Sequence, residues 1–229
     1  MRNFLLIITI FILFFTSCST STNLTKSSAY EGVYSEKPLS VLIMPPINRS
    51  TNVEAKEFFH ATLNVPIANS GYYVIPPFLS MEILKRESAY DSELFLNQSL
   101  DIFNEVFAAD VVLFTIIHKW DKNTIGAKVK VEIEYILKST KSNEILYSRH
   151  GNIIYDASVS TKAGGIGGLI ADVALSAINT AATKYIDLAK TCNNYTFQDL
   201  PKGKYSPLFN IDGNEYAKPK NFTKRLSAQ

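Results

Sequence analysis

Cysteine and histidine are scarce in this sequence. Its 229 residues include two cysteines and three histidines. The histidines, His60, His118 and His150, lie in three separate segments, and none belongs to an HExxH motif. The sequence also lacks a CxxC pair and a GxSxG nucleophile motif. We therefore predict no catalytic residue, no metal site and no cofactor, and we expect that the protein is not an enzyme.

A surplus of charge of one sign is missing as well. Lys and Arg together number 23, and Asp and Glu number 21. This balance gives no electrostatic reason to expect binding to nucleic acid or to an anionic membrane surface, so we predict no nucleic-acid partner. Hydrophobic residues make up 46% of the chain, which is typical of a globular protein and argues against wholesale disorder.

The amino-terminal residues are apolar but too few to span a membrane. The segment 4–15 (FLLIITIFILFF) is broken only by one threonine, and it is shorter than the roughly 20 residues of a spanning helix. Its length is typical of the apolar part of a signal peptide. Small residues then precede Cys18, as at the cleavage site of bacterial lipoproteins. We predict that residues 1–17 are a signal peptide and that Cys18 carries lipid; an ordinary signal peptide with an incidental cysteine is the alternative.

Lipid on Cys18 leaves Cys192 without an intramolecular partner. Such a leftover thiol in an exported protein is usually buried or paired with another chain. A disulfide between the two cysteines is the alternative. Ser19, rather than an aspartate, follows Cys18, which favours the outer membrane over retention in the inner one. We therefore predict a lipid-anchored protein of the outer membrane, facing either the periplasm or the outside.

The composition of the chain changes along its length. Residues 18–39 are rich in Ser and Thr and show no apolar period, which predicts a flexible tether between lipid and domain. Residues 40–190 carry the apolar patterns of an α/β domain. Residues 191–229 are polar and contain many Pro, Asn and Tyr residues, which predicts an irregular carboxy-terminal tail.

Within the domain, segments of strand and helix character alternate at first, and strands then follow one another. The order predicts a mixed β-sheet with helices packed on it, as a single α/β (α+β) domain with the element order β-α-β-α-α-β-β-β-α. The segment 110–120 is the most apolar and is expected to be a central strand buried on both faces. The expected strands are 40–47, 72–75, 110–120, 128–137 and 145–155, and the expected helices are 51–63, 79–86, 99–107 and 163–190.

The segment 128–137 alternates almost strictly between apolar and charged residues. This pattern is typical of a strand with one buried and one wet face. The charged residues are Lys128, Lys130, Glu132 and Glu134. We interpret them as a solvated face whose charge pairs contribute little to stability.

A glycine run opens the alanine-rich segment 163–183. Glycines spaced four apart let helices approach closely. Asp172 is the single charge of the segment, and an aspartate at mid-bilayer costs about 2.5–3.5 kcal/mol on insertion scales, so contact with protein is favoured over membrane insertion. The predicted helix-contact face consists of Gly164, Gly168, Leu169 and Val173.

Several segments taken in order resemble one known family. They are 41–48 (VLIMPPIN), 71–76 (GYYVIP), 109–114 (ADVVLF), 164–169 (GGIGGL) and 200–207 (LPKGKYSP). Together they resemble a bacterial lipoprotein family of unassigned function that includes a meningococcal vaccine antigen. The resemblance implies an outer-membrane anchor and a fold similar to curli-secretion lipoproteins and to the amino-terminal domain of the Tol-system β-propeller protein. It also implies a curli-secretion-like lipoprotein as a candidate partner, and it transfers no catalytic residue.

From these observations we predict a non-enzymatic lipoprotein that binds other envelope proteins as an accessory to assembly, with homo-oligomers as one form of such binding. Two alternatives stay open. The first is a membrane-inserting or pore-associated subunit that uses residues 163–183. The second is a small-ligand-binding lipoprotein with a cleft at the carboxyl ends of the parallel strands, near Met44, Asn48 and Ile75.

Overall fold

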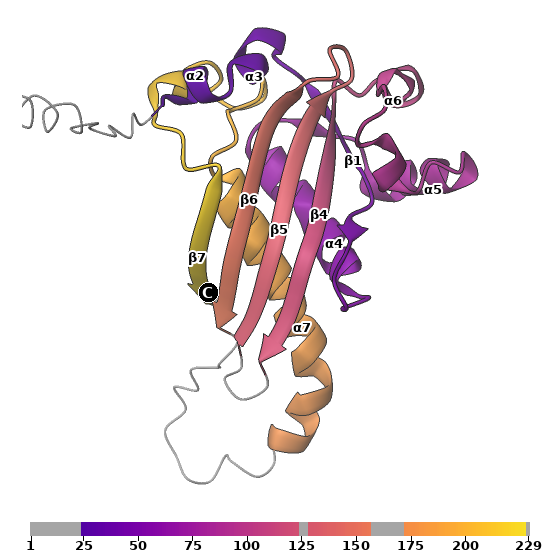
Figure 1. Cartoon of the computed structure of the whole chain (residues 1–229), viewed down its shortest axis with the longest axis vertical. Helices are drawn as coiled ribbons and strands as arrows, with labels where there is room; N and C mark the ends of the chain where they lie inside the picture. The colour runs from indigo at the N-terminus through magenta and orange to yellow at the C-terminus, as the bar shows by residue number, and fades with distance from the viewer. Residues whose placement is uncertain (1–23, 124–127, 157–171, 228–229) are drawn as a thin grey trace, which may run out of the picture.

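A seven-stranded mixed sheet forms the centre of the protein in a computed structural model (Figure 1). The structure describes residues 24–123, 128–156 and 172–227. The helices and strands are, in chain order, α2 (Lys26–Ala29), α3 (Glu31–Glu36), β1 (Ser40–Ile43), β2 (Ile47–Asn48), α4 (Ala55–Asn69), β3 (Tyr73–Val74), α5 (Pro77–Arg86), the 3-10 helix η1 (Ser92–Phe95), α6 (Asp101–Phe107), β4 (Val111–Asn123), β5 (Lys128–Ser139), β6 (Ile145–Asp156), α7 (Asp172–Phe197), the 3-10 helix η2 (Asp212–Asn214) and β7 (Asn221–Ser227).

The strands are arranged in the order β3-β1-β4-β5-β6-β7, with β2 also paired to β4. The strands β1, β2 and β3 join the sheet in parallel, whereas β4, β5 and β6 form an antiparallel meander. The last strand, β7, pairs in parallel with β6. The predicted fold class and element order are therefore confirmed, and the structure adds β2, β7 and the two amino-terminal helices.

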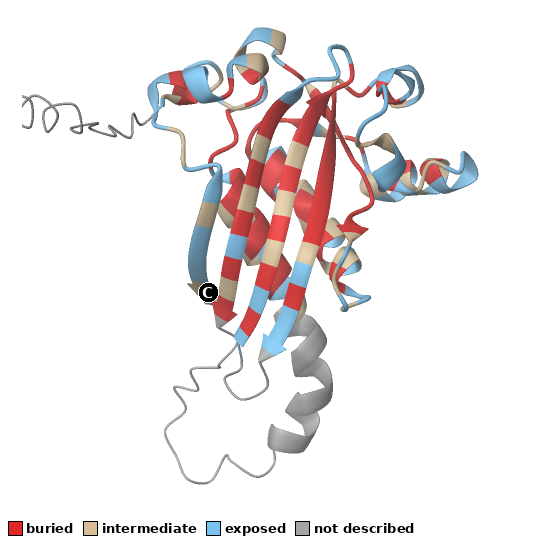
Figure 2. Ribbon diagram, viewed as in Figure 1, coloured by how far each residue is buried: buried red, intermediate tan, exposed pale blue. Residues whose placement is uncertain are grey.

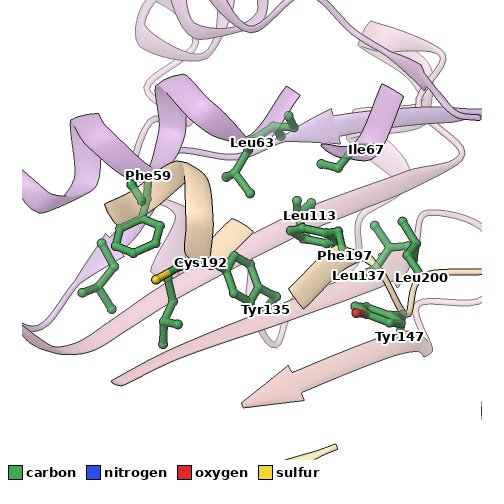
Figure 3. Packing of buried hydrophobic residues seen from close by; sticks show 14 of the residues in the cluster. Phe59, Leu63, Ile67, Leu113, Tyr135, Leu137, Tyr147, Cys192, Phe197 and Leu200 are labelled. Atoms are coloured by element: carbon green, nitrogen blue, oxygen red, sulfur yellow. The ribbon is translucent and has the colours of Figure 1, made fainter. Parts of the chain in front are cut away.

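Two long helices, α4 and α7, lie together against one face of the sheet (Figure 1). Their apolar side chains meet those of the strands in the main core (Figure 3). Leu63 of α4, Leu113 of β4 and Leu137 of β5 are all buried there. Complete burial of a side chain of this size contributes about 1.5–3 kcal/mol, so this layer supplies most of the hydrophobic stabilisation.

A smaller core covers part of the opposite face. Val112 and Phe114 of β4 point to that side, where they pack with Leu84 of α5 and Phe103 of α6. Because neighbouring residues of β4 enter different cores, this strand is buried on both faces, as predicted for segment 110–120. The small core lies at the β1 and β4 side of the sheet, so β5 and β6 are covered less on this face.

The amino-terminal segment from residue 24 onwards differs from the predicted tether. The helices α2 and α3 fold against the domain, and Tyr30 and Val33 join the main core. Tyr30 also donates a hydrogen bond to the buried carboxylate of Asp199. The segment looked like a linker because its few apolar residues show no period, and its partners lie near the other end of the chain.

The carboxy-terminal segment is also more ordered than predicted. The helix α7 continues to Phe197, and both Phe197 and Leu200 are buried in the main core. The residues Asn221–Ser227 form β7 and extend the sheet. Buried polar groups, which a search for apolar periods overlooks, fix the segment between α7 and β7: Asp199 and Asp212 accept hydrogen bonds from Tyr30 and Tyr34.

Candidate functional site

The face of the sheet opposite α4 and α7 carries polar side chains along β5 and β6. Burial along these strands alternates with the residue number, as Figure 2 shows by its changing colours. The buried residues, such as Val131 and Ile133, point to the helices, and the residues between them point to the other side. We call the part of this side that the small core does not cover the open face.

Four titratable side chains of three neighbouring strands meet on the open face. His118 comes from β4, Glu132 and Glu134 from β5, and His150 from β6. Glu134 and His150 are direct partners in the register of the two strands, so their side chains stand next to each other. We call these four residues the His–Glu cluster.

An irregularity in β4 aims His118 into this cluster. Ile117 pairs with Ile133, but Lys119 already pairs with Glu132, so one residue of β4 is extra. A bulge of this kind turns two consecutive side chains to the same face. His118 and Lys119 therefore both lie on the open face, each beside a glutamate.

The geometry of the His–Glu cluster consists of two pairs held against each other. The Nε2 atom of His118 lies 3.2 Å from Oε2 of Glu134, and Nε2 of His150 lies 3.2 Å from Oε1 of Glu132. The two imidazole rings stack with centroids 5.3 Å apart and planes 6° apart. The four side chains keep 24–28% of their surface exposed, so water reaches them. Lys119 is more exposed, with Nζ 3.9 Å from Glu132.

Imidazole nitrogens and carboxylate oxygens can carry protons or hold a metal ion. In the cluster, His118, Glu134 and His150 each place one such atom within 4.8 Å of the other two. The third histidine, His60, takes no part: it is largely buried on α4, and this burial lowers its pKa.

Sequence reasoning missed this arrangement. The alternation in 128–137 predicts one solvated face that contains Glu132 and Glu134 together with Lys128 and Lys130. The two lysines are indeed exposed, whereas the glutamates are half-buried and paired with histidines. One signal was available: Glu134 lies 16 residues after His118, and His150 lies 16 residues after Glu134. In an antiparallel meander, equal spacing aligns residues of neighbouring strands only near the middle of the strands, so the signal is weak without the register.

The residues predicted for lipidation and helix contact are outside this cluster. Cys18, Gly164, Gly168 and Leu169 lie outside the described residues, as does the side chain of Val173, so these predictions stay predictions.

Cys192 is free and fully buried between α7 and the sheet, as expected for a thiol without a partner. Burial also raises the pKa of this thiol, which makes it unreactive. In the described part of α7, as in the other described helices, no stretch is long and apolar enough to cross a membrane.

At the strand ends, where a ligand cleft is one of the predicted alternatives, Met44, Asn48 and Ile75 do not line a common cleft. Met44 and Ile75 are buried, and the side-chain amide of Asn48 donates a hydrogen bond to the carbonyl of Asn52 at 2.7 Å. Asn48 therefore shapes its own turn. An open hollow lies nearby, and it is lined by residues 51–54 and 120–122.

Comparison with known proteins gives the following matches. A family model described as "Putative lipoprotein GNA1162-like" matches residues 28–204. The "Putative lipoprotein NMB1124/NMB1162" of Neisseria meningitidis serogroup B is 22% identical over 169 residues, which are 71% of this chain and 76% of the relative. The family match confirms the resemblance found in the sequence motifs.

Solved structures are similar over parts of the chain. The crystal structure of lipoprotein GNA1162 from Neisseria meningitidis gives a TM-score of 0.47 at 21% identity and covers 64% of this chain and 99% of its own. The LpoB C-terminal domain from Escherichia coli gives 0.36 at 18% identity, over 55% of this chain and 95% of its own.

Proposed function

Because the chain belongs to the GNA1162-like lipoprotein family, we propose that it is a non-enzymatic protein of the outer membrane, anchored by lipid on Cys18, that binds another envelope protein. The signal-like segment before Cys18 supports the anchor. The observation that carries the binding role is the outer edge of β7, the last strand of the sheet, which is unpaired among the described residues.

The anchor would hold the folded part close to the bilayer. The first residue that the structure describes is Leu24, whose carbonyl accepts a hydrogen bond from the backbone N–H of Ala217 at 2.9 Å. Lys26 then adds a backbone bond of 2.7 Å to Glu215. The chain between Cys18 and Leu24 can span at most about 20 Å, at ~3.3–3.6 Å per residue. The protein would therefore meet partners near the membrane surface, instead of reaching far from it as a long tether would allow.

The edge of β7 offers free backbone groups. Within the described residues, β7 pairs with β6 on one side only. The backbone N–H of His150 donates a hydrogen bond to the carbonyl of Lys220. By the alternation of a parallel ladder, the backbone N–H and C=O groups of Phe222, Lys224 and Leu226 also point to β6. The N–H and C=O groups of Asn221, Thr223 and Arg225 point outwards by the same alternation.

Such an edge accepts an added strand from another protein. The side chains of Lys224 and Arg225 are exposed on β7 and bring positive charge to it. The occupant that fits best is therefore an extended segment with acidic residues. Backbone hydrogen bonds would supply affinity, and the opposite charges would favour this partner over others.

Photocrosslinking in intact cells tests this proposal. A photoreactive residue at Arg225 should form an adduct with a second envelope protein. One at the exposed Glu82 should not, because its helix, α5, contacts β1, which is separated from β7 by three strands. Thr223→Pro removes an outward N–H without touching the bonds to β6, so it should reduce the adduct strongly. Thr223→Val is the matched control, because it keeps the N–H and suits a strand. Adducts only between copies of this chain, or equal adducts in both Thr223 variants, would refute strand addition by a second protein.

A further inference from the structure

The His–Glu cluster on the open face is not needed to stabilise the fold. Its four side chains lie away from the main core and from the small core, and water reaches all of them. Pairs of side chains that water reaches in this way contribute little to stability. Nevertheless a bulge in β4, which interrupts the pairing with β5, directs His118 to this position. Bulges often re-aim a side chain at a functional site.

The charge of the cluster favours a cation. Two glutamates lie beside two imidazoles. Among the described residues, the lysine in contact with them is Lys119, whose side chain is 64% exposed and can turn away. Each histidine directs Nε2, a nitrogen that can coordinate metal, at a carboxylate oxygen 3.2 Å away. An ion placed between these atoms would contact nitrogen and oxygen at once and would reduce the repulsion between the two carboxylates.

The ligand atoms also identify the type of ion. Imidazole nitrogen combined with carboxylate oxygen suits Zn²⁺ and similar first-row divalent ions, whereas Ca²⁺ and Mg²⁺ prefer sites made of oxygen alone. Ligand atoms around Zn²⁺ lie about 2.0–2.2 Å from the metal, so the atoms of His118, Glu134 and His150, now within 4.8 Å of one another, would have to close in by about 1 Å. Rotations of half-exposed side chains can supply this movement, while the three paired strands hold the backbone in place.

We propose that His118, Glu134 and His150 bind one divalent transition-metal ion of the zinc type on the open face. Glu132, the second carboxylate of the cluster, lies beside His150. Three protein ligands leave a position for water or for a group from a partner protein. The site is independent of strand addition at β7.

Metal titration of the mature lipidated chain tests the site. The protein is purified in detergent micelles, stripped with EDTA and dialysed, and Zn²⁺ is then titrated in a calorimeter. Co²⁺ is added in parallel, because its visible absorption reports the number and type of ligands. The native chain should bind one ion per molecule in a saturable manner. His118→Asn and His150→Asn should each weaken binding at least about tenfold, since loss even of a group supporting a ligand can cost that much.

Two further variants keep the result interpretable. Glu134→Gln preserves the shape of the side chain and should weaken binding. It therefore still tests the site if a histidine variant fails to fold. Glu144→Gln changes an exposed glutamate in the turn between β5 and β6 and should leave binding unchanged. The proposal is refuted if the native chain shows no saturable binding of either ion. It is refuted equally if the double His118→Asn/His150→Asn variant, shown to be folded by circular dichroism, binds Zn²⁺ as tightly as the native chain.

Discussion

The two faces of the strands β4, β5 and β6 differ in what they carry. The face below α4 and α7 is apolar and fully covered, and residues such as Ile133 lose all contact with water there. The open face, one residue further along the same strands, holds the half-exposed His–Glu cluster. A strand can serve two purposes because its side chains alternate, so changes on one face need not disturb the other. This separation can be tested residue by residue.

The largest effect is expected where α4 meets the sheet. Leu63 is fully buried among the apolar residues of the main core (Figure 3). Leu63→Ala should lower the free energy of unfolding by about 2–5 kcal/mol, because it removes buried methyl groups and leaves a cavity. Urea denaturation followed by circular dichroism measures the change. A loss below about 1 kcal/mol would show that this layer is less tightly packed than the structure indicates.

A smaller loss is expected from one polar atom in the same layer. Cys192→Ser places a hydroxyl where the thiol is fully buried, and a buried hydroxyl without a good partner costs about 1–3 kcal/mol. Cys192→Ala, which adds no polar group, should cost less than the serine variant. The same denaturation experiment compares the two. If serine were the better tolerated substitution, the site would have to be more polar than it is here.

An intermediate effect on stability is expected from the ion pair between Lys26, in α2, and Glu215, shortly before β7. The side chain of Glu215 is 59% exposed and lies 2.8 Å from the nearly buried ammonium of Lys26. The hydrogen bond from Lys26 outweighs the opposing effect of burial and lowers the pKa of Glu215.

A lowered folded-state pKa means that this stabilisation is present above the ordinary value of a glutamate, about 4.3, and is lost as the pH falls through the folded-state value. An exposed pair contributes only about 0.2–1 kcal/mol, so the effect is modest. Limited proteolysis should show faster cleavage in α2 below that pH. Glu215→Gln should reduce this pH dependence, and the second carboxylate beside Lys26, Asp212, accounts for the remainder. A pH effect of unchanged size in Glu215→Gln would assign it to groups other than Glu215.

The smallest effect on stability is expected on the open face. Glu134→Gln should change the free energy of unfolding by no more than about 0.5 kcal/mol in the absence of metal, as is usual for half-exposed substitutions away from a core. Leu63→Ala, studied under the same conditions, provides the scale. If Glu134→Gln lowered the free energy of unfolding by several kcal/mol, the open face would contribute to stability as the covered face does, and the proposed division between the two faces would be wrong.

Much of the fold could be predicted from the sequence because local patterns report local structure. The alternation in 128–137 gave β5 with its buried side, and the apolar segment 110–120 gave the central strand β4. The order of helices and strands followed from turn residues and periodicity. These signals depend on neighbours within about ten residues, which is the range that a pattern in one sequence covers.

What could not be predicted depends on long-range contacts. Lys26 and Asp212 form an ion pair although 186 residues separate them in the sequence. No local sequence pattern around either residue predicts this pairing. The His–Glu cluster depends on the register of β5 against β6 and on one extra residue near His118. A shift of one residue in either pairing would have sent the histidines to different places, and the sequence shows no turn strict enough to fix it.

The contacts of residues 24–39 with the segment 199–215 have a consequence for the export that we propose. During export, a chain that crosses a membrane with its amino terminus first brings residues 24–39 across well before Asp199, Asp212 and Glu215. The helices α2 and α3 lack their partners until then, and β7 cannot join the sheet. Native structure around the amino terminus therefore has to wait until almost the whole chain has crossed. On the proposed lipidation of Cys18, a lipid-transferring enzyme would act in that interval, before α2 and α3 have packed against the domain.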